Sequence, residues 1–289
     1  MATIVERRAA DESAVLFICD YSPPRGADPA LLDGVRAVPA DWISVAYNPG
    51  KATRVSSAAA ARWIKDHAGR DVVFTLGTRD MNRLAVESLL LGAALLGLEN
   101  VVVVQGDPFS ERELAGVKAV DDFTSTALLR AIVQMNEGVD YRGSRLQAPT
   151  ALCAGATIDL GRDRDAELAL TRRKRAAGAR FFLTQPVYDA GVVESFLDGY
   201  ASAAGEPLGA PVFVGVQVMT AESLRFGDVP ARANEQLDAG RPGEEIAGEV
   251  LRAFVERGLR SIYLVPPIMR GGRRDYEAAA RVIEGYRAG

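Results

Sequence analysis

The sequence predicts a (β/α)8 barrel, in which eight parallel strands form a closed ring and helices surround them. Apolar, β-branched runs recur eight times along the 289 residues, and helical segments fill the gaps between them. The runs are continuous rather than alternating, which is typical of parallel strands, because these are buried on both faces. A chain of this length can form such a barrel as one domain.

The starts of the apolar runs place the strands along the chain. They lie near Ala14, Trp42, Asp71, Asn100, Thr150, Arg180, Pro211 and Ser261. The two longest intervals follow the fourth and seventh runs, so these connections are expected to carry insertions. The turn-rich stretches 205–210 and 239–243 are short connections, and we therefore expect one domain over residues 1–289.

The helices are expected at about 58–67, 80–96, 123–136, 165–177, 192–204, 244–257 and 276–287. Asp80 is the expected N-cap of the second of these, and Gly97 and Gly178 are expected stop residues. An open, doubly wound sheet is the alternative fold. It is disfavoured because SPPRGADP, and no glycine-rich phosphate loop, follows the first strand.

Composition narrows the classes of function. The net charge of −4 argues against a nucleic-acid or anionic membrane partner. The most apolar helical stretch, 89–98, has about half the length that spans a bilayer. Cys19 and Cys153 both lie in apolar runs, as expected of a cytoplasmic protein in a reducing compartment. A single histidine, His67, leaves no histidine-based metal cluster or Ser-His-Asp triad, so we expect no metal.

The carboxyl ends of barrel strands carry active sites, and Asp20 ends the first strand. Alternation puts Asp20 on the same face as Leu16 and Ile18. If this is the inner face, the carboxyl group loses hydration, which favours its protonated form. Such a group can donate a proton at neutral pH. The sequence therefore predicts Asp20 as a proton donor.

Other polar residues are expected at the same end of the barrel. In the fourth strand Val103, Gln105 and Asp107 would share a face, and in the sixth strand Gln185 would share the inner face with Leu183. Two carboxylates and two amides would then converge on one cavity mouth. Any barrel rim is polar, however, and Asp107 also fits a turn-capping role. The same end should hold Asn48, Thr78, Arg79, Thr157, Asp159, Gln217 and Arg270.

At these positions the sequence resembles the methylenetetrahydrofolate reductase family. The similarity lies in DYSPPRGADP from Asp20, in TRDMNRLAVESLLLGAALLGLENVVVVQGDP from Thr78 and in KRAAGARFFLTQPVYD from Lys174. YLVPPIMRGG from Tyr263 also resembles the last strand of one branch of the family. The matching segments run in order from about Phe17 to Pro267.

The resemblance implies a barrel oxidoreductase in which NAD(P)H reduces FAD and FAD passes hydride to 5,10-methylenetetrahydrofolate. Asp20 takes the position of the family's proton donor, and Asp107 that of the aspartate between pterin and flavin. The substrate-binding residues implied or assigned with it are Gln185, Gln217 and Arg270. The assigned cofactor-binding residues are Thr75, Gln105, Gly106, Asp107, Arg173 and Lys174, the last two as flavin-phosphate contacts.

Several positions depart from the family pattern. The acid is Asp20 rather than glutamate, and flavin-contacting side chains are replaced at Ala46, Thr75 and Gly77, with no tyrosine near Ala154. Two alternatives therefore stay open: hydride transfer directly from a nicotinamide or a deazaflavin, or a non-catalytic pterin-binding subunit. The sequence does not decide reaction direction, nicotinamide type or assembly, and a homo-oligomer is left open.

Overall fold

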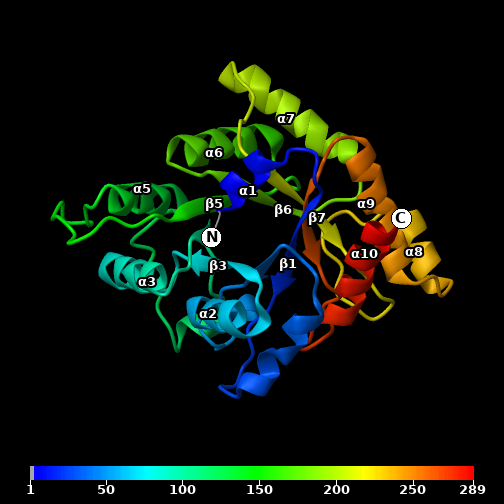
Figure 1. Ribbon diagram of the computed structural model, residues 1–289, viewed down its shortest axis with the longest axis horizontal. Helices are drawn as coiled ribbons and strands as arrows, with labels where there is room; N and C mark the ends of the chain where they lie inside the picture. Colours follow the sequence, from blue (N-terminus) through cyan, green and yellow to red (C-terminus); the bar gives the residue numbers. More distant parts are fainter. Residues whose placement is uncertain (1–2) are drawn as a thin grey trace.

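The computed structural model describes residues 3–289 and has the predicted architecture, a closed parallel barrel with strand order β1 to β8 (Figure 1). β8 pairs with β1 and closes the ring. Each strand begins at or shortly after the expected residue. The strands are β1 (Leu16–Tyr21), β2 (Trp42–Val45), β3 (Asp71–Gly77), β4 (Asn100–Val104), β5 (Cys153–Ile158), β6 (Phe181–Pro186), β7 (Val212–Gln217) and β8 (Ser261–Val265).

The expected helices form the ring around the barrel (Figure 1). They are α2 (Ser57–Ala68), α3 (Arg83–Leu95), α5 (Ser125–Asn136), α6 (Arg164–Ala176), α7 (Ala190–Ala204), α9 (Gly243–Glu256) and α10 (Tyr276–Ala288). The expected cap of α3 was wrong, because Asn82 accepts the hydrogen bond from the Ala85 amide at 2.9 Å. Asp80 instead pairs with Arg79.

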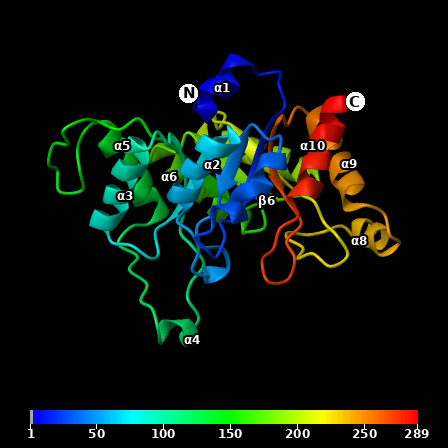
Figure 2. The same cartoon turned by 60° about the horizontal axis from the view of Figure 1, so that its bottom comes forward.

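Shorter helices fill the remaining connections. After β1 the chain forms a 3-10 helix (Pro29–Ala37) in place of the α-helix that a regular barrel would have. The predicted insertions contain α4 (Glu111–Leu114) after β4 and α8 (Ala231–Asp238) after β7. In Figure 2, α4 projects from the end of the barrel opposite to α1 (Ile4–Ala10). None of the helices within residues 3–289 is both long and apolar enough to cross a membrane.

The barrel wall separates an inner and an outer core. Leu16 and Ile18 belong to the inner cluster, whereas Phe17 and Cys19 pack outward against the helices. Ile4 of α1 is fully buried in the inner cluster, and its amide donates to Asn100 Oδ1 at 3.0 Å. The amino-terminal helix therefore covers the end of the barrel at which the strands begin.

The face expected for β4 was wrong. Val102 and Val104 lie in the inner cluster, and Val103 packs in the outer one. The run of four valines contains no alternation from which the inner face could be read. Gln105 and Asp107 follow the strand in a loop, so the strand's alternation does not set their direction.

Candidate functional site

Asp20 lies on the inner face of β1, as predicted, and its carboxyl group is held at both oxygens. The Tyr263 hydroxyl donates to Oδ1 and the Arg274 Nε donates to Oδ2, each at 2.9 Å. The Asp20 side chain is 9% exposed and that of Arg274 is 8% exposed. Both contacts come from residues outside β1, so the orientation of the carboxyl group is fixed by other parts of the chain.

A hairpin after β8 brings Arg274 to this position. Ile268 pairs with Arg274 in an antiparallel bridge, and the Met269 amide donates to the Arg273 carbonyl at 2.8 Å. Gly271 and Gly272 both have positive φ at the turn, a conformation that glycine adopts without steric cost. The hairpin thus folds back over the mouth of the barrel and places one guanidinium beside Asp20.

Asp20 borders a cavity of about 260 Å3 at this end of the barrel, called the smaller cavity below. Thr75 and Gln185, both assigned from sequence, also border it. Its wall combines inner strand residues with residues of the loops that follow β7 and β8. The remaining lining residues are Ser44, Ala46, Tyr47, Val102, Val104, Thr157, Leu183, Thr184, Pro186, Phe226, Tyr263, Val265, Ile268 and Arg274.

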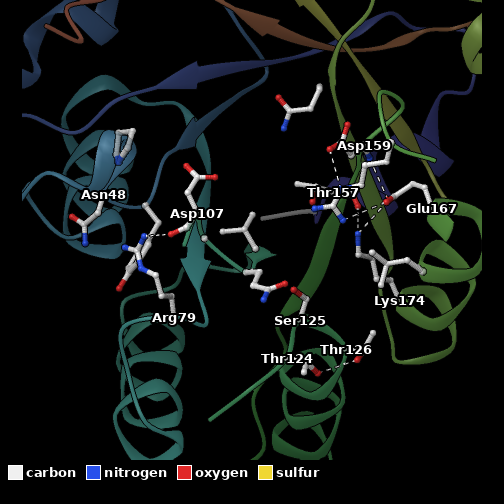
Figure 3. A pocket seen from close by; sticks show the side chains of 18 of the residues that line it. Asn48, Arg79, Asp107, Thr124, Ser125, Thr126, Thr157, Asp159, Glu167 and Lys174 are labelled. Atoms are coloured by element: carbon white, nitrogen blue, oxygen red, sulfur yellow. Dashed lines mark hydrogen bonds and ion pairs between the residues drawn. The ribbon is translucent and has the colours of Figure 1, made fainter. Parts of the chain in front are cut away.

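The larger cavity, of about 610 Å3, lies beside the first and is more polar (Figure 3). It contains five residues assigned from sequence to the cofactor, namely Gln105, Gly106, Asp107, Arg173 and Lys174. Tyr47, Val104, Thr157 and Gln185 line both cavities. In Figure 3, Arg79 and Asp107 lie on one wall, and Asp159, Glu167 and Lys174 lie on the opposite one. Two ligands bound in these cavities would meet at the four shared residues.

Lys174 is buried in an ion pair within the protein. Its Nζ lies 3.5 Å from Glu167 Oε1 and donates to the Thr157 carbonyl at 2.5 Å. Burial lowers the pKa of Lys174, and the Glu167 carboxylate only partly offsets this effect. Glu167 and Lys174 lie seven residues apart on the inner face of α6. The ammonium group expected to bind a flavin phosphate therefore already has two partners in the protein.

Most of the other cations around the larger cavity are paired as well. Lys51 lies 2.7 Å from Glu113, and Arg79 contacts both carboxylate oxygens of Asp80 at 2.5 and 2.9 Å. The hydrogen bond from Arg79 is the main reason that the pKa of Asp80 is lowered. Within residues 3–289, Arg173 makes no ion pair and is exposed on the cavity wall. It is the guanidinium most available to an anionic ligand.

Two residues assigned to the substrate lie outside both cavities. Gln217 is buried and holds the loop after β7, because its Oε1 accepts from the Phe226 amide at 2.9 Å and its Nε2 donates to the Leu224 carbonyl at 2.8 Å. It thereby supports Phe226, which borders the smaller cavity. Arg270 is exposed at the turn of the hairpin after β8. The structure does not bring either side chain to the cavity that contains Asp20.

Tyr47 lines both cavities and packs against Gly77. A Cβ atom at position 77 would lie 2.7 Å from Tyr47 Cδ1, so a larger residue would displace the ring. Burial, together with nearby Asp80, raises the pKa of Tyr47 to about 12, so its phenol remains protonated. Glycine at position 77, where the family has a flavin-contacting side chain, therefore makes room for the ring of Tyr47 next to both cavities.

The family model for methylenetetrahydrofolate reductase matches residues 5–226 of this chain. The chain belongs to the methylenetetrahydrofolate reductase family. The matched segment includes β1 to β7 and both cavities except for the residues contributed by β8 and the hairpin after it. A comparison with curated proteins gives no match.

Solved structures share the fold of this methylenetetrahydrofolate reductase family member at low sequence identity. An uncharacterized protein from Clostridium thermocellum, described as binding two copies of 5-methyl-5,6,7,8-tetrahydrofolic acid, is 12% identical, with a TM-score of 0.67 and 99% of each chain covered. A 2,3-dimethylmalate lyase of the PEP mutase/isocitrate lyase superfamily is 14% identical, with a TM-score of 0.51 and coverage of 100% of this chain and 83% of the lyase. A putative lyase/mutase from Burkholderia cenocepacia is 15% identical, with a TM-score of 0.50 and coverage of 97% and 85%.

The larger cavity is a poor match for the FAD that the family implies. A flavin diphosphate needs free cationic or amide donors, but Lys51, Arg79 and Lys174 are already paired. Two acidic side chains, Asp107 and Asp159, also line the cavity. The donor set therefore does not fit a tightly held FAD in this family member.

Sequence reasoning missed the partners of the expected site residues. Tyr263 and Arg274 were not assigned, although both fall in or directly after the YLVPPIMRGG segment. Glu167 was also missed, and there a signal was available, because residues seven apart in a helix lie on the same face. No local pattern connects Asp20 with Arg274, since they lie 254 residues apart in the chain.

Proposed function

We propose that this protein reduces 5,10-methylenetetrahydrofolate to 5-methyltetrahydrofolate with NAD(P)H as the reductant. The observation that carries the proposal is the Asp20 carboxyl group on the wall of the smaller cavity, since the sequence resemblance assigns this residue to the position of the family's acid. Gln185 reaches the same cavity from β6 and supplies an amide for a pterin ring. The methyltetrahydrofolate bound by the Clostridium thermocellum protein supports a folate as the ligand.

In the proposed reaction the pterin occupies the smaller cavity, with its reactive carbon towards the wall shared by both cavities. Asp20 transfers a proton to N10 of the folate, and the bond between N10 and the methylene carbon breaks with its electron pair going to N10. The resulting iminium carbon accepts a hydride and becomes the methyl group. Each turnover consumes one proton and one hydride, and water restores the proton of Asp20.

The larger cavity supports NAD(P)H as the direct hydride donor. Its free guanidinium, Arg173, can bind a dinucleotide phosphate, and a nicotinamide at the shared wall would lie next to the pterin. Such an arrangement needs only the modest affinity of a co-substrate that leaves after each turnover. The paired state of Lys51, Arg79 and Lys174 is compatible with that affinity.

An absorbance spectrum combined with an activity assay tests whether NAD(P)H is the direct hydride donor. We expect purified protein to lack flavin absorbance and to oxidise NADH or NADPH when 5,10-methylenetetrahydrofolate is added, with no gain from added FAD. Activity that appears only after FAD is supplied, together with a yellow holoprotein, would overturn direct transfer and leave the folate reaction intact.

Gln185→Ala should weaken folate binding by about 1–2 kcal/mol, because a polar group of the pterin would lose its partner. Nicotinamide affinity should change less. Equilibrium binding of 5-methyltetrahydrofolate, measured by calorimetry, gives the folate value without turnover. Gln105→Ala is the matched control, since Gln105 borders only the larger of the two cavities. Unchanged folate affinity in Gln185→Ala would show that this amide does not contact the substrate.

A further inference from the structure

We propose that Arg274 and Tyr263 are positioning residues that hold the carboxyl group of Asp20 in place and stabilise its charge once its proton has moved to substrate. The inference builds on the proposed folate reaction. It adds two residues to which neither the family pattern nor the sequence assigns a role, and one of them, Arg274, lies outside β1 to β8.

The geometry leaves Asp20 little freedom. Tyr263 holds Oδ1 and Arg274 holds Oδ2, so rotation of the carboxyl group would break both contacts. Tyr263 is fixed in the wall of β8, where its ring packs against the inner cluster. Arg274 is fixed by its hairpin and by a hydrogen bond from its Nη1 to the Gly272 carbonyl at 3.2 Å. The two donors thus approach from separate elements.

Both partners keep their protons and act as donors. Burial, followed by the negative charge of Asp20, raises the pKa of Tyr263 well above its usual value. Burial alone would lower the pKa of Arg274, but the charge and hydrogen bond of Asp20, together with Tyr276 and Tyr263, outweigh it and the pKa is raised. The other ionisable groups of this cluster are Cys19, Tyr276 and Arg54, of which Arg54 lies next to Arg274 and repels it. Arg274 is therefore the one cation bonded directly to Asp20 among residues 3–289.

These contacts match the charge change in the proposed step. When Asp20 gives its proton to N10, the carboxyl group becomes negative on a side chain that is 9% exposed. Donors already aimed at its two oxygens stabilise that charge without rearrangement. They also fix the direction in which the carboxyl group faces the folate, and small displacements of a catalytic group cost much of a rate.

The test uses Arg274→Met and Arg274→Lys in the full chain, with Arg273→Met as control. Arg273 is exposed and borders neither cavity, so its replacement should leave activity unchanged. We expect Arg274→Met to lower kcat by about 10- to 100-fold with the folate KM within about threefold of wild type. Arg274→Lys keeps the charge and should recover part of the rate. Tyr263→Phe, which removes one hydrogen bond, should lower kcat by about 10-fold.

A spectroscopic measurement makes the test independent of turnover. Infrared difference spectra against Asp20→Asn, on protein with 13C-labelled aspartate, report the hydrogen bonds that the carboxyl group of Asp20 accepts. We expect the same Asp20 bands in wild type and Arg273→Met, and shifted bands in Arg274→Met and Tyr263→Phe, because each of these two variants removes one hydrogen bond. Unshifted Asp20 bands in Arg274→Met would overturn the inference even if the protein reduced no folate.

The kinetic result can also overturn it. If Arg274→Met binds 5-methyltetrahydrofolate as poorly as it turns over, Arg274 contacts the folate itself and does not act through Asp20. A wild-type kcat in Arg274→Met would likewise contradict a positioning role. If wild type lacks folate reduction but the infrared bands change as expected, the proposed function fails while the role of Arg274 stands.

Discussion

Asp20→Asn should lower turnover of 5,10-methylenetetrahydrofolate by at least about 100-fold, the typical contribution of a general acid. The substitution keeps the size of the side chain but removes the transferable proton. Its amide can still occupy the position between Tyr263 and Arg274, so binding of 5-methyltetrahydrofolate should survive. Steady-state kinetics and calorimetric binding on the same preparation separate the two effects.

Asp20→Glu is the companion variant. It restores the longer acid of the family pattern and keeps the chemistry, so it should retain activity far above that of Asp20→Asn. Its longer side chain must share the space held by Tyr263 and Arg274, and some loss relative to wild type is expected. Wild-type turnover in Asp20→Asn would show that another group donates the proton or that the substrate is different.

Lys174→Met should lower the free energy of unfolding by about 3–5 kcal/mol, the usual cost of leaving one partner of a buried ion pair alone. Glu167 is 2% exposed and would lose the cation at 3.5 Å, leaving only the solvent-exposed Arg162 at 3.9 Å from its Oε2. Its Oε2 has no hydrogen-bond partner within residues 3–289, and its Oε1 would keep the Asp159 amide at 3.2 Å. Denaturant titration followed by circular dichroism measures the change.

Two controls assign this effect to the ion pair. Arg173→Met removes the neighbouring exposed cation. It should leave the free energy of unfolding nearly unchanged and weaken the binding of the nicotinamide dinucleotide. The double variant Glu167→Gln/Lys174→Met removes both charges and should recover much of the lost stability. A Lys174→Met protein with wild-type stability but poor cofactor binding would instead support the phosphate contact that the family resemblance implies.

The fold was predictable because strand and helix periods alternate along the whole chain. The inner face of β1 was predictable too, since only one face of that strand carries the acid next to Leu16 and Ile18. In β4 the four valines gave no such contrast, and the predicted face was wrong. Alternation therefore locates a residue only where the two faces of a strand differ in chemistry.

The rest of the candidate site depends on contacts between distant parts of the chain. Arg274 reaches Asp20 because two glycines turn the hairpin after β8, and no motif encodes that return. Gln217 was assigned to substrate because it ends a strand. In the structure, its side-chain amide instead forms hydrogen bonds with backbone groups of the following loop. Strand ends thus indicate candidate residues, but only the packed loops decide which of them remain free to meet a ligand.

The amino-terminal helix determines the end of the barrel at which ligands can enter. With Ile4 buried in the inner cluster, α1 covers one end of the barrel, and both cavities open at the other. In the proposed reaction, folate and nicotinamide therefore enter and leave at the same end of the barrel, on the two sides of the four residues that the cavities share.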